Sequence, residues 1–415
     1  MRVLLVSKFV HHVGGVETYL RWQANALADA GHEVGVVGMT PPPGERPMEW
    51  PGRTWLTPER SYAAGAAGRA RSAAASVWSP RVGRVVRDAV AELQPDVVHF
   101  HGTCYQLTPS AVDAARSAGV PSVVTAHEYK LTCANQRLYD HRTAAVCTDC
   151  VGVSGWRKTT APLRRRCVKG SLAASAIGAV EGRVADRVWA LTAPLVLTPS
   201  RFMRDLLLAD GWEADAVRYL DLSWRRDGEE PAPLTSGSNL VFLGRLAPEK
   251  GVDLLLRVWE RLAGRHPRVR LRVIGDGDQE QELRILAGAL ALPRVDFLGR
   301  LDATQIQREL AQAAVTAHTA QWFENSPFAV RESLMAGVPA VVADLGGMPE
   351  MVSPATGRVV RHDDIDAWER ALDEMLSHPL DDATFAQAVR ERAMTDSEHL
   401  DRLLAHYDGL PPVTA

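Results

Sequence analysis

Two basic side chains stand where they could bind a phosphate-bearing substrate. Arg245 and Lys250 belong to the segment GRLAPEKG (244–251), just past the end of an expected strand. An Arg and a Lys on one strand-to-helix connection can converge on a diphosphate and neutralise the charge of a leaving group, as a metal ion would. Taken alone, the pair fits two solvated surface cations equally well, so other residues must decide.

Two carboxylates follow the apolar segment VTAHTA (315–320). Glu324 and Glu332 bracket ENSPFAVRE, and eight positions span a little over two helical turns, so both can lie along one side of a helix start. Residues 325–327 indicate where that helix begins, and Gly337 indicates where it ends. Carboxylates also occur near helix N-termini simply because they complement the dipole.

A glycine pair follows the first expected strand. Gly14 and Gly15 precede a helix, so backbone N–H groups and the helix N-terminus could approach a phosphate closely. The stretch HHVGGVETYL lacks the GxGxxG pattern, which argues against a dinucleotide-dependent dehydrogenase.

Four of the five cysteines have the spacing of a metal site. Thirteen, two and sixteen residues separate Cys133, Cys147, Cys150 and Cys167. In a cytoplasmic protein a CxxC flanked by two further cysteines is typical of tetrahedral structural zinc; an iron–sulfur cluster, a disulfide or free thiols are the alternatives. The surrounding insertion has little apolar material, so a metal would replace a core. Cys104 is expected to be a small buried residue.

Alternating strands and helices position these residues in a first domain over 1–222. Residues 2–6, 16–30 and 33–39 predict a strand, a helix and a strand, which is a βαβ unit and implies a parallel sheet. The pattern continues with strands at 96–102 and 122–128, a Cys-rich insertion at about 128–170, a helix near 171–190, and a strand leading into a helix at 194–208 with Ser200 as N-cap.

A second domain follows a linker. Residues 223–238 are rich in charge, Pro, Gly and Ser and lack periodicity. The second domain is then expected over 239–385, and helices over 386–415 are expected to pack back on the first domain. Strands are predicted at 239–246, 270–277, 294–299, 315–320 and 339–346.

Residues 41–87 do not fit this alternation. A Pro-rich start and a small-residue, Arg-punctuated stretch make this segment too long for an ordinary connection. We predict an ordered helical excursion near a ligand site, with a mobile surface insertion as the alternative.

Size and composition agree with two globular domains. The 415 residues exceed the roughly 250–300 at which one core stops growing. Counted along the sequence, residues 1–200 hold 23 Lys and Arg against 15 Asp and Glu, and the remainder holds 24 against 35, giving +8 and −11. The basic half suggests an anionic partner, although solvated Arg-rich helices would give the same count.

No segment suggests export or membrane spanning. The opening MRVLLVSKFVHH is interrupted by Lys8 and His, and no later run offers about 18 uncharged apolar residues. We therefore expect a cytoplasmic protein, with a peripheral position at the inner membrane face as an option. We expect no nucleic-acid partner.

Together these features resemble the retaining nucleotide-sugar glycosyltransferases of family four, over nearly the whole chain. The resemblance implies the GT-B fold, an α/β architecture of two Rossmann-like doubly wound parallel-sheet domains facing a central cleft. The motifs that carry it are GGVET (14–18), LTPSRFMRDLL (197–207), GRLAPEKG (244–251), VIGDG (273–277), FLGRL (297–301), ENSPFAVRESLMAGVPAV (324–341) and GGMPEMV (346–352). Where many members have Asn-Gly-Val-Asp, this chain has YLDLSW (219–224), which leaves the hinge geometry open.

The resemblance also implies roles for individual residues. Glu324 would face the donor sugar, and His127 would stand near its anomeric carbon. Arg245 and Lys250 would clamp the donor phosphates, and Glu332 would bind the ribose hydroxyls. The other residues that it assigns to the donor site are Gly14, Gly15, Gly275, Arg300, Leu301, Asn325, Ser326, Pro327 and Phe328.

The predicted reaction is transfer of a sugar from a nucleotide diphosphate to an acceptor hydroxyl on a glycan, a lipid or a natural product. No catalytic divalent metal is expected, because cationic side chains would replace it. Two alternatives remain at this stage, a sugar-nucleotide epimerase of the same fold and a non-catalytic, metal-stapled scaffold that binds nucleotide.

Overall fold

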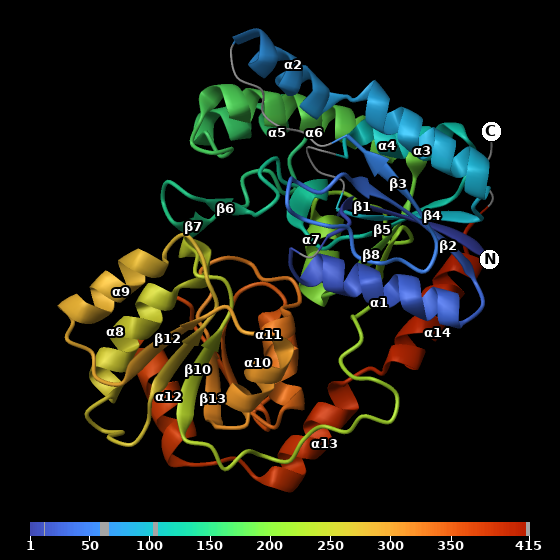
Figure 1. Cartoon of the computed structure of the whole chain (residues 1–415). Helices are drawn as coiled ribbons and strands as arrows, with labels where there is room; N and C mark the ends of the chain where they lie inside the picture. The colour runs from blue at the N-terminus through green and yellow to red at the C-terminus, as the bar shows by residue number, and fades with distance from the viewer. Residues whose placement is uncertain (12, 59–65, 103–106, 412–415) are drawn as a thin grey trace. The chain divides into compact units, whose positions relative to one another are not determined.

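The computed structural model describes residues 1–11, 13–58, 66–102 and 107–411 (Figure 1). The backbone divides into two compact units. The first unit comprises residues 1–143, 147–222 and the chain from Glu398 onward, and the second comprises residues 144–146 and 223–397. Cys104, expected to be buried, lies outside the described residues.

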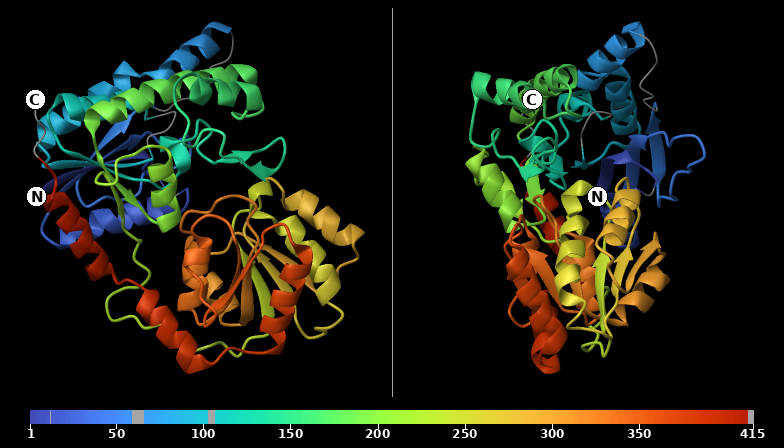
Figure 2. Two further views of the ribbon diagram at one scale, coloured as in Figure 1. Left: turned by 180° about the vertical axis from the view of Figure 1, so that it is seen from behind. Right: turned by 90° about the vertical axis from the view of Figure 1, so that its left-hand side faces the viewer.

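The first unit is built on a seven-stranded parallel sheet in the order β3-β2-β1-β4-β5-β8-β9. Its inner strands are largely buried, because helices cover both faces (Figure 2). The strands are β1 (Arg2–Phe9), β2 (Glu33–Met39), β3 (Arg53–Thr57), β4 (Val97–His101), β5 (Ser122–Thr125), β8 (Leu195–Thr198) and β9 (Val217–Tyr219).

The helices of this unit connect those strands or pack on them. They are α1 (Gly15–Asp29), α2 (Ala66–Val77), α3 (Pro80–Leu93), α4 (Pro109–Ser117), α5 (Gly155–Arg165), α6 (Leu172–Thr192), α7 (Arg201–Ala209) and the C-terminal α14 (Asp396–Asp408). The predicted N-cap of α7 is confirmed, since the Ser200 hydroxyl accepts from Met203 N at 3.1 Å.

The second unit has a six-stranded parallel sheet in the order β12-β11-β10-β13-β14-β15. The strands are β10 (Asn239–Leu243), β11 (Leu271–Ile274), β12 (Val295–Gly299), β13 (Ala313–His318), β14 (Ala340–Ala343) and β15 (Gly357–Val360). The helices are α8 (Val252–Leu262), α9 (Glu280–Ala289), α10 (Ala303–Leu310), α11 (Phe328–Met335), α12 (Ile365–Ser377) and α13 (Asp382–Arg392), with short 3₁₀ turns η2 (Pro248–Lys250) and η3 (Met348–Glu350).

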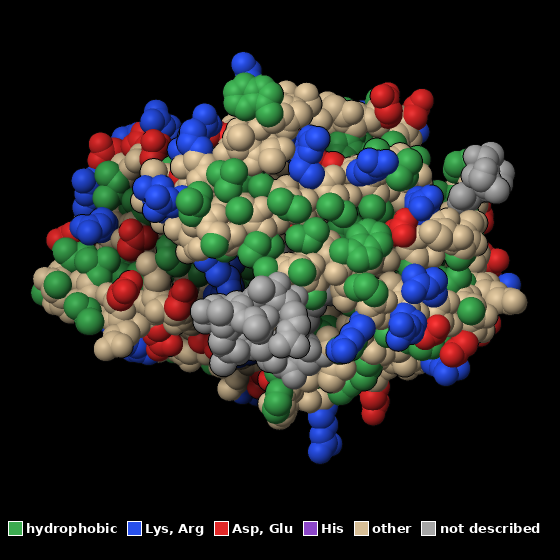
Figure 3. All heavy atoms as spheres, turned by 90° about the horizontal axis from the view of Figure 1, so that it is seen from above, with side chains coloured by type: hydrophobic (Ala, Val, Ile, Leu, Met, Phe, Trp, Pro, Cys, Tyr) green, Lys and Arg blue, Asp and Glu red, His purple; other side chains and the backbone are tan. Residues whose placement is uncertain are grey.

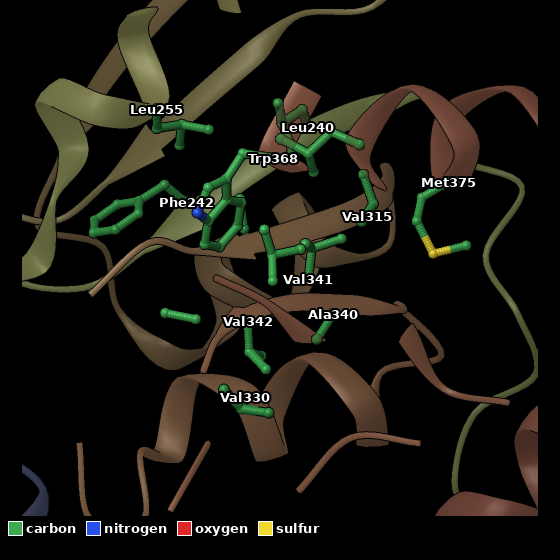
Figure 4. Packing of buried hydrophobic residues seen from close by; sticks show 14 of the residues in the cluster. Leu240, Phe242, Leu255, Val315, Val330, Ala340, Val341, Val342, Trp368 and Met375 are labelled. Carbon is green, nitrogen blue, oxygen red and sulfur yellow. The ribbon is translucent and has the colours of Figure 1, made fainter. Parts of the chain in front are cut away.

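The core of the second unit lies between the sheet and its helices. Phe242 of β10, Val315 of β13 and Trp368 of α12 are buried in one cluster (Figure 4). Trp368 is fully buried, so it fixes α12 against the sheet that carries the candidate site.

In both sheets the strand order reverses at one point. β1 lies beside β4 in the first, and β10 lies beside β13 in the second. The connections leave in opposite directions from such a pair, which opens a crevice at the carboxyl ends of the strands where ligands bind in doubly wound sheets. Residues after these four strands are therefore the first place to look for a site.

The predicted strands are confirmed, and several others lie outside the predicted ranges, among them β3 and β15. β3 lies in the region expected to be only helical, although α2 and α3 confirm helices there. β15 was not predicted either. Both strands have four or five residues and pair on one side only, so neither shows a long apolar pattern.

The insertion after β5 has more core than its sequence suggested. Besides α5 it contains a 3₁₀ turn, η1 (Tyr129–Leu131), and two short strands, β6 (Tyr139–Asp140) and β7 (Ala145–Val146). Leu138 and Tyr139 are each 1% exposed, so the expectation of little apolar material was wrong. Lys130 and Glu181 add a buried ion pair to this core.

The two C-terminal helices differ in the unit they join. α13 belongs to the second unit, whereas α14 (Asp396–Asp408) lies mostly in the first. Leu403 and Tyr407 of α14 are buried in the first unit with Leu20 and Leu27 of α1. The last helix is therefore an integral part of the first unit.

Candidate functional site

Two loops meet at the strand reversal of the second unit. η2 follows β10 and carries Lys250, while the turn after β13 carries Glu324. The Lys250 ammonium donates to Glu324 Oε1, and both side chains are largely buried. The structure thus joins two predicted site residues that lie 74 positions apart. This charge pair therefore lies at the strand reversal, where doubly wound sheets bind ligands.

Trp322 completes the pair. Its indole N–H donates to Glu324 Oε1 at 2.7 Å, and its ring lies beneath the Lys250 ammonium at 5.6 Å. The carboxylate therefore accepts from two donors, while the cation also contacts a π-face. Neither contact was predicted from sequence, because Trp322 resembles an ordinary apolar residue next to a strand.

The backbone of Glu324 is fixed by a glycine. A Cβ at Gly346 would lie 2.1 Å from Glu324 O, and Gly346 has φ of 67°. The next residue, Gly347, donates its N–H to the same carbonyl at 2.7 Å. Any side chain at position 346 would push the Glu324 turn away. This is the physical reason for Gly-Gly in the motif GGMPEMV.

Arg245 lies on the same loop as Lys250 but has a different partner. Its guanidinium donates to Glu249 Oε1 at 2.8 Å, and its side chain is 53% exposed while that of Glu249 is 1% exposed. Glu249 thus holds one side of the guanidinium and leaves the rest accessible. This half-exposed Arg has donors left for a ligand, since a guanidinium carries five N–H groups.

The two predicted carboxylates do not share a helix. Glu324 precedes α11, whereas Glu332 lies within it, so the expectation of one helical face was wrong. Burial raises the pKa of Glu332, because desolvation disfavours the charged form of its carboxylate. A buried carboxylate of this kind gains stability from a ligand that donates hydrogen bonds to it.

The segment between them is held by a buried arginine. Arg331 donates to Ser326 Oγ and to Ser223 O, and its guanidinium lies over the Phe328 ring at 5.4 Å. Asn325 and Pro327 flank this contact, and Pro327 is the N-cap of α11. Residues 325–328 therefore have a fixed conformation beside Glu324.

The predicted base-contacting residues lie at the ends of neighbouring strands. Gly275 follows β11, and Arg300 and Leu301 follow β12. A Cβ at Gly275 would lie 1.9 Å from Gly244 O, so glycine is required there for packing alone. Arg300 is exposed, and Leu301 packs on the small cluster around Ile274.

In the first unit the predicted phosphate-binding glycines begin α1. Gly14 N donates to Glu17 Oε2 at 2.8 Å, so this amide is already engaged by a capping carboxylate. Burial raises the pKa of Glu17, although backbone hydrogen bonds oppose the shift. A phosphate at this helix start would therefore depend on Gly15 and later amides, or would have to displace Glu17.

His127 belongs to a buried array of imidazoles at the carboxyl ends of β4 and β5. His101 Nδ1 lies 3.0 Å from His127 Nε2, and the His99 ring stacks on that of His101 at 4.1 Å. Burial lowers the pKa of His127 to about 3 and places those of His99 and His101 well below the usual range. The three rings are therefore neutral near pH 7.

Helix α14 closes this array from the other side. Tyr407 OH lies 2.6 Å from His99 Nδ1, and Tyr19 OH lies 2.8 Å from His399 Nε2. His399 Nδ1 lies 2.7 Å from Asp221 O, which can only accept, so His399 is protonated on Nδ1. The C-terminal helix therefore takes part in ordering the histidines.

The tautomer of His127 can be inferred from the hydrogen bonding of the neighbouring His101. His101 Nε2 is buried without a hydrogen-bond partner. An orphaned N–H costs more than a bare lone pair, so the favoured arrangement has the His101 proton on Nδ1, donated to His127 Nε2. His127 then carries its own proton on Nδ1 and is a neutral hydrogen-bond donor.

The four predicted ligand cysteines surround one small cavity of the insertion. All are free thiols. Burial, followed by the neighbouring sulfurs, raises the pKa of Cys150 and Cys167 to about 12. Across the described residues, no group of three or more His, Cys, Asp or Glu has the arrangement of a metal site. The cysteines therefore converge as predicted, but the zinc prediction is not confirmed.

Two doubly wound parallel-sheet domains, one with a charge pair at its strand reversal, form an architecture that binds ligands at the carboxyl ends of its strands, and comparison with known proteins specifies the class of protein. The family model for the glycosyl transferase 4-like domain matches residues 14–222, and that for group 1 glycosyl transferases matches residues 231–392. The chain belongs to this glycosyltransferase family.

Three similar proteins illustrate the match. A GDP-mannose-dependent alpha-mannosyltransferase of Mycolicibacterium smegmatis is 27% identical over 99% of this chain and 98% of its own length. A GDP-mannose-dependent monoacylated alpha-(1-6)-phosphatidylinositol monomannoside mannosyltransferase of Corynebacterium glutamicum is 34% identical, over 35% of this chain and 40% of its own length. The crystal structure of Anabaena HepE in complex with UDP has a TM-score of 0.69 at 17% identity, covering 99% of this chain and 100% of that one.

The predicted fold and activity are confirmed. The chain has the GT-B fold and is a retaining glycosyltransferase that moves a sugar from a nucleotide-sugar donor to an acceptor. Neither the epimerase nor the non-catalytic scaffold is supported. Among the described helices, none combines the length and the apolar character that crossing a membrane requires.

Proposed function

We propose that Lys250 and Arg245 of the second domain bind the donor diphosphate. The observation that supports this most is the Lys250–Glu324 pair at the strand reversal, since it places a desolvated ammonium where doubly wound sheets bind ligands. Arg245 adds a half-exposed guanidinium on the same loop. Two cations of this kind offset the charge of a diphosphate without a metal ion.

The proposed reaction uses that charge compensation. The bond from the anomeric carbon to the diphosphate breaks, and the diphosphate takes the electron pair. The acceptor hydroxyl attacks from the same face, and its proton passes to a departing phosphate oxygen. Lys250 and Arg245 stabilise the leaving group most strongly when its charge is greatest, so they lower the barrier.

Glu324 has two parts in this scheme. In the free protein it holds the Lys250 ammonium in place. Once a phosphate takes that ammonium, the carboxylate faces the donor sugar, where its charge balances the positive charge that develops at the anomeric carbon.

Glu332 is proposed to bind the ribose hydroxyls. Its buried carboxylate can accept two hydrogen bonds from a diol, which would offset its desolvation. Gly275, Arg300 and Leu301 are proposed to surround the base, and residues 325–328 to line the sugar and phosphate. All lie at carboxyl ends of strands or at the start of α11.

In the first domain we propose that His127 donates Nδ1–H to a hydroxyl of the transferred sugar, and that His101 is its positioning residue. With a pKa near 3, His127 cannot serve as a cationic acid near neutral pH. The ¹⁵N shifts of labelled His127 test the assignment: His101→Gln should change its tautomer populations, and unchanged shifts would remove His101 from the scheme. Gly15 is proposed to approach the phosphates.

The acceptor hydroxyl belongs to a glycan, a lipid or a natural product, and a peripheral membrane position would suit the lipid. α5 and α6 expose Trp156, Leu172, Val180 and Leu191, and the face seen in Figure 3 shows apolar side chains interspersed with Lys, Arg and other groups. Amphipathic surfaces of this kind bind anionic bilayers. Sedimentation with anionic vesicles should fall for Trp156→Glu; equal sedimentation of both proteins would exclude this surface.

A structural zinc at Cys133, Cys147, Cys150 and Cys167 stays a proposal, because the thiols converge without forming a ligand group. A metal would have to draw them together and remove their protons. Protein purified anaerobically with reductant should contain about one zinc per chain. Iron with visible absorption would indicate a cluster, and no metal would eliminate the site.

One screen tests the function as a whole. Thermal shift with a panel of nucleoside diphosphates should show one preferred base; the names of the relatives suggest guanine, and the HepE complex suggests uracil. The matching sugar nucleotide should then be consumed only with an acceptor or, slowly, by hydrolysis. Failure of every diphosphate to stabilise the protein would contradict the proposal.

A further inference from the structure

A second pocket lies within the first unit, apart from the residues discussed so far except Cys167. Its volume is about 570 Å³, within the usual range for small-molecule sites. α2, the start of α6 and the Cys-rich insertion form its walls. The lining residues are Ser72, Ala73, Ser76, Asn135, Gln136, Arg137, His141, Cys167, Val168, Lys169, Ala174 and Ile177.

Hydrogen bonds of the Asn135 side chain hold the walls of the pocket together. Asn135 Nδ2 donates to Tyr139 O at 2.8 Å and to Cys167 O at 3.3 Å, which ties the two arms of the insertion together. Asn135 Oδ1 accepts from Arg137 N at 3.0 Å. The shape of the pocket is therefore set by hydrogen bonds within the insertion.

Two lining residues have unfavourable backbone conformations. Gln136 has φ of 60° and Lys169 has φ of 52°, and neither is glycine. Such residues concentrate at ligand sites, where the surrounding structure enforces them. Here they bring one amide and one ammonium to the same pocket.

The chemistry of the lining is one-sided. Arg137, His141 and Lys169 are basic, and the lining residues that the structure describes include no Asp or Glu. Val168 and Ile177 supply an apolar wall, so the pocket combines positive charge with hydrocarbon surface. Gln136 Oε1 is buried without a hydrogen-bond partner, which calls for a donor such as a hydroxyl.

We propose that this pocket binds the acceptor, and that the acceptor is an amphiphile with a phosphate group next to an apolar chain. The basic residues bind the phosphate, the apolar wall takes the first part of the chain, and Gln136 accepts from a hydroxyl. This inference rests on the proposed function, which requires an acceptor site in the first domain. The exposed apolar residues of α5 and α6 would bring such an amphiphile to the pocket.

Calorimetry with decyl phosphate, below its micelle concentration, tests the proposal on the full chain. Decyl phosphate should bind, and inorganic phosphate and decyl glucoside should each bind at least about tenfold more weakly, because each lacks one half of the recognition. Equal binding of inorganic phosphate would reduce the pocket to a simple anion site. Equal binding of decyl glucoside would reduce it to an apolar surface.

Variants locate the binding. The double variant Arg137→Gln, Lys169→Gln should weaken decyl phosphate binding at least about tenfold. Arg166→Gln is the matched control, because Arg166 is exposed and precedes the lining residue Cys167 but does not itself line the pocket. Ala174→Trp fills the pocket with every charge kept and should abolish binding. Unchanged affinity in the double variant or in Ala174→Trp would overturn the proposal.

A second readout separates this inference from the proposed function. Every variant is also titrated with the nucleoside diphosphate found in the screen, and its affinity should stay unchanged. Diphosphate binding without decyl phosphate binding would refute the acceptor pocket alone. Failure of the unsubstituted protein to bind any nucleoside diphosphate would refute the proposed function.

Discussion

The two strand reversals carry opposite kinds of chemistry. In the second unit Lys250, Glu324, Arg245 and Glu249 form ion pairs. In the first, the pair β1 and β4 lies beside stacked neutral histidines whose protons are set by one another and by tyrosines. Under the proposed function, this difference separates charge compensation from hydrogen-bond positioning, since ammonium groups suit a diphosphate and neutral imidazoles suit sugar hydroxyls.

Substitution of Glu324 should have the largest effect and tests the charged site of the second unit. Glu324→Gln keeps the shape and the contact with Trp322 but removes the charge, so turnover should fall roughly 10²–10³-fold. Binding of the nucleoside diphosphate should hold or tighten, because Lys250 loses a competing anion. Steady-state kinetics and calorimetry measure the two effects. Weaker diphosphate binding with normal turnover would mean that Glu324 serves only to hold Lys250.

Substitution of Glu332 should have the second largest effect, and it should act on the donor Michaelis constant instead of on turnover. A ribose contact is made equally in the ground state and the transition state, so Glu332→Gln should raise the donor Michaelis constant about tenfold and leave turnover nearly unchanged. Glu282→Gln, on α9, is a control acidic residue outside the site. If turnover fell instead, the roles given to the two glutamates would have to be exchanged.

The neutral histidines predict a pH dependence of stability. Burial lowers the pKa of His101 below the 6.5 of an exposed His, so the unfolded chain binds more protons, and stability falls as the pH drops below 6.5. In the His101→Gln variant this protonation cannot occur. The free energy of unfolding of the variant should therefore fall less between pH 7.5 and pH 5 than that of the unsubstituted protein, by about 1–2 kcal/mol. Urea unfolding at both pH values measures it.

The control for that titration is His378→Gln. His378 is exposed and lies outside the histidine array, so this variant shows what replacing an imidazole by an amide does to the measurement by itself. The same loss of stability in His101→Gln and the unsubstituted protein would show that His101 is already protonated at pH 5, and the neutral array would be wrong.

Removal of divalent metal ions should have the smallest effect, since we expect no change in transfer activity. Lys250 and Arg245 are proposed to compensate the diphosphate, so EDTA at concentrations that remove loosely held magnesium should leave transfer unchanged. Complete loss of activity, restored by magnesium or manganese, would show that cationic side chains do not suffice in the second unit.

The sequence revealed the charged site better than the neutral one. Arg245, Lys250 and Glu324 belong to short motifs in which residue type indicates the chemistry. The histidine array joins β4, β5 and α14, and a contact such as His99 with Tyr407 spans 308 positions that no local pattern links. The alternation His99-Phe100-His101 at a strand end was the one available indication. The orientation of Glu324 likewise depends on Gly346, which only the fold brings beside it.

The most direct test of the central claim is the affinity for the nucleoside diphosphate in Lys250→Ala and Arg245→Ala, measured by calorimetry beside Arg257→Ala, an exposed control on α8. If the two cations bind a desolvated diphosphate, each site variant should lose roughly 2–5 kcal/mol of binding free energy, with the fold and the control unaffected. Unchanged affinity in both site variants would contradict the account, because both would then be surface cations.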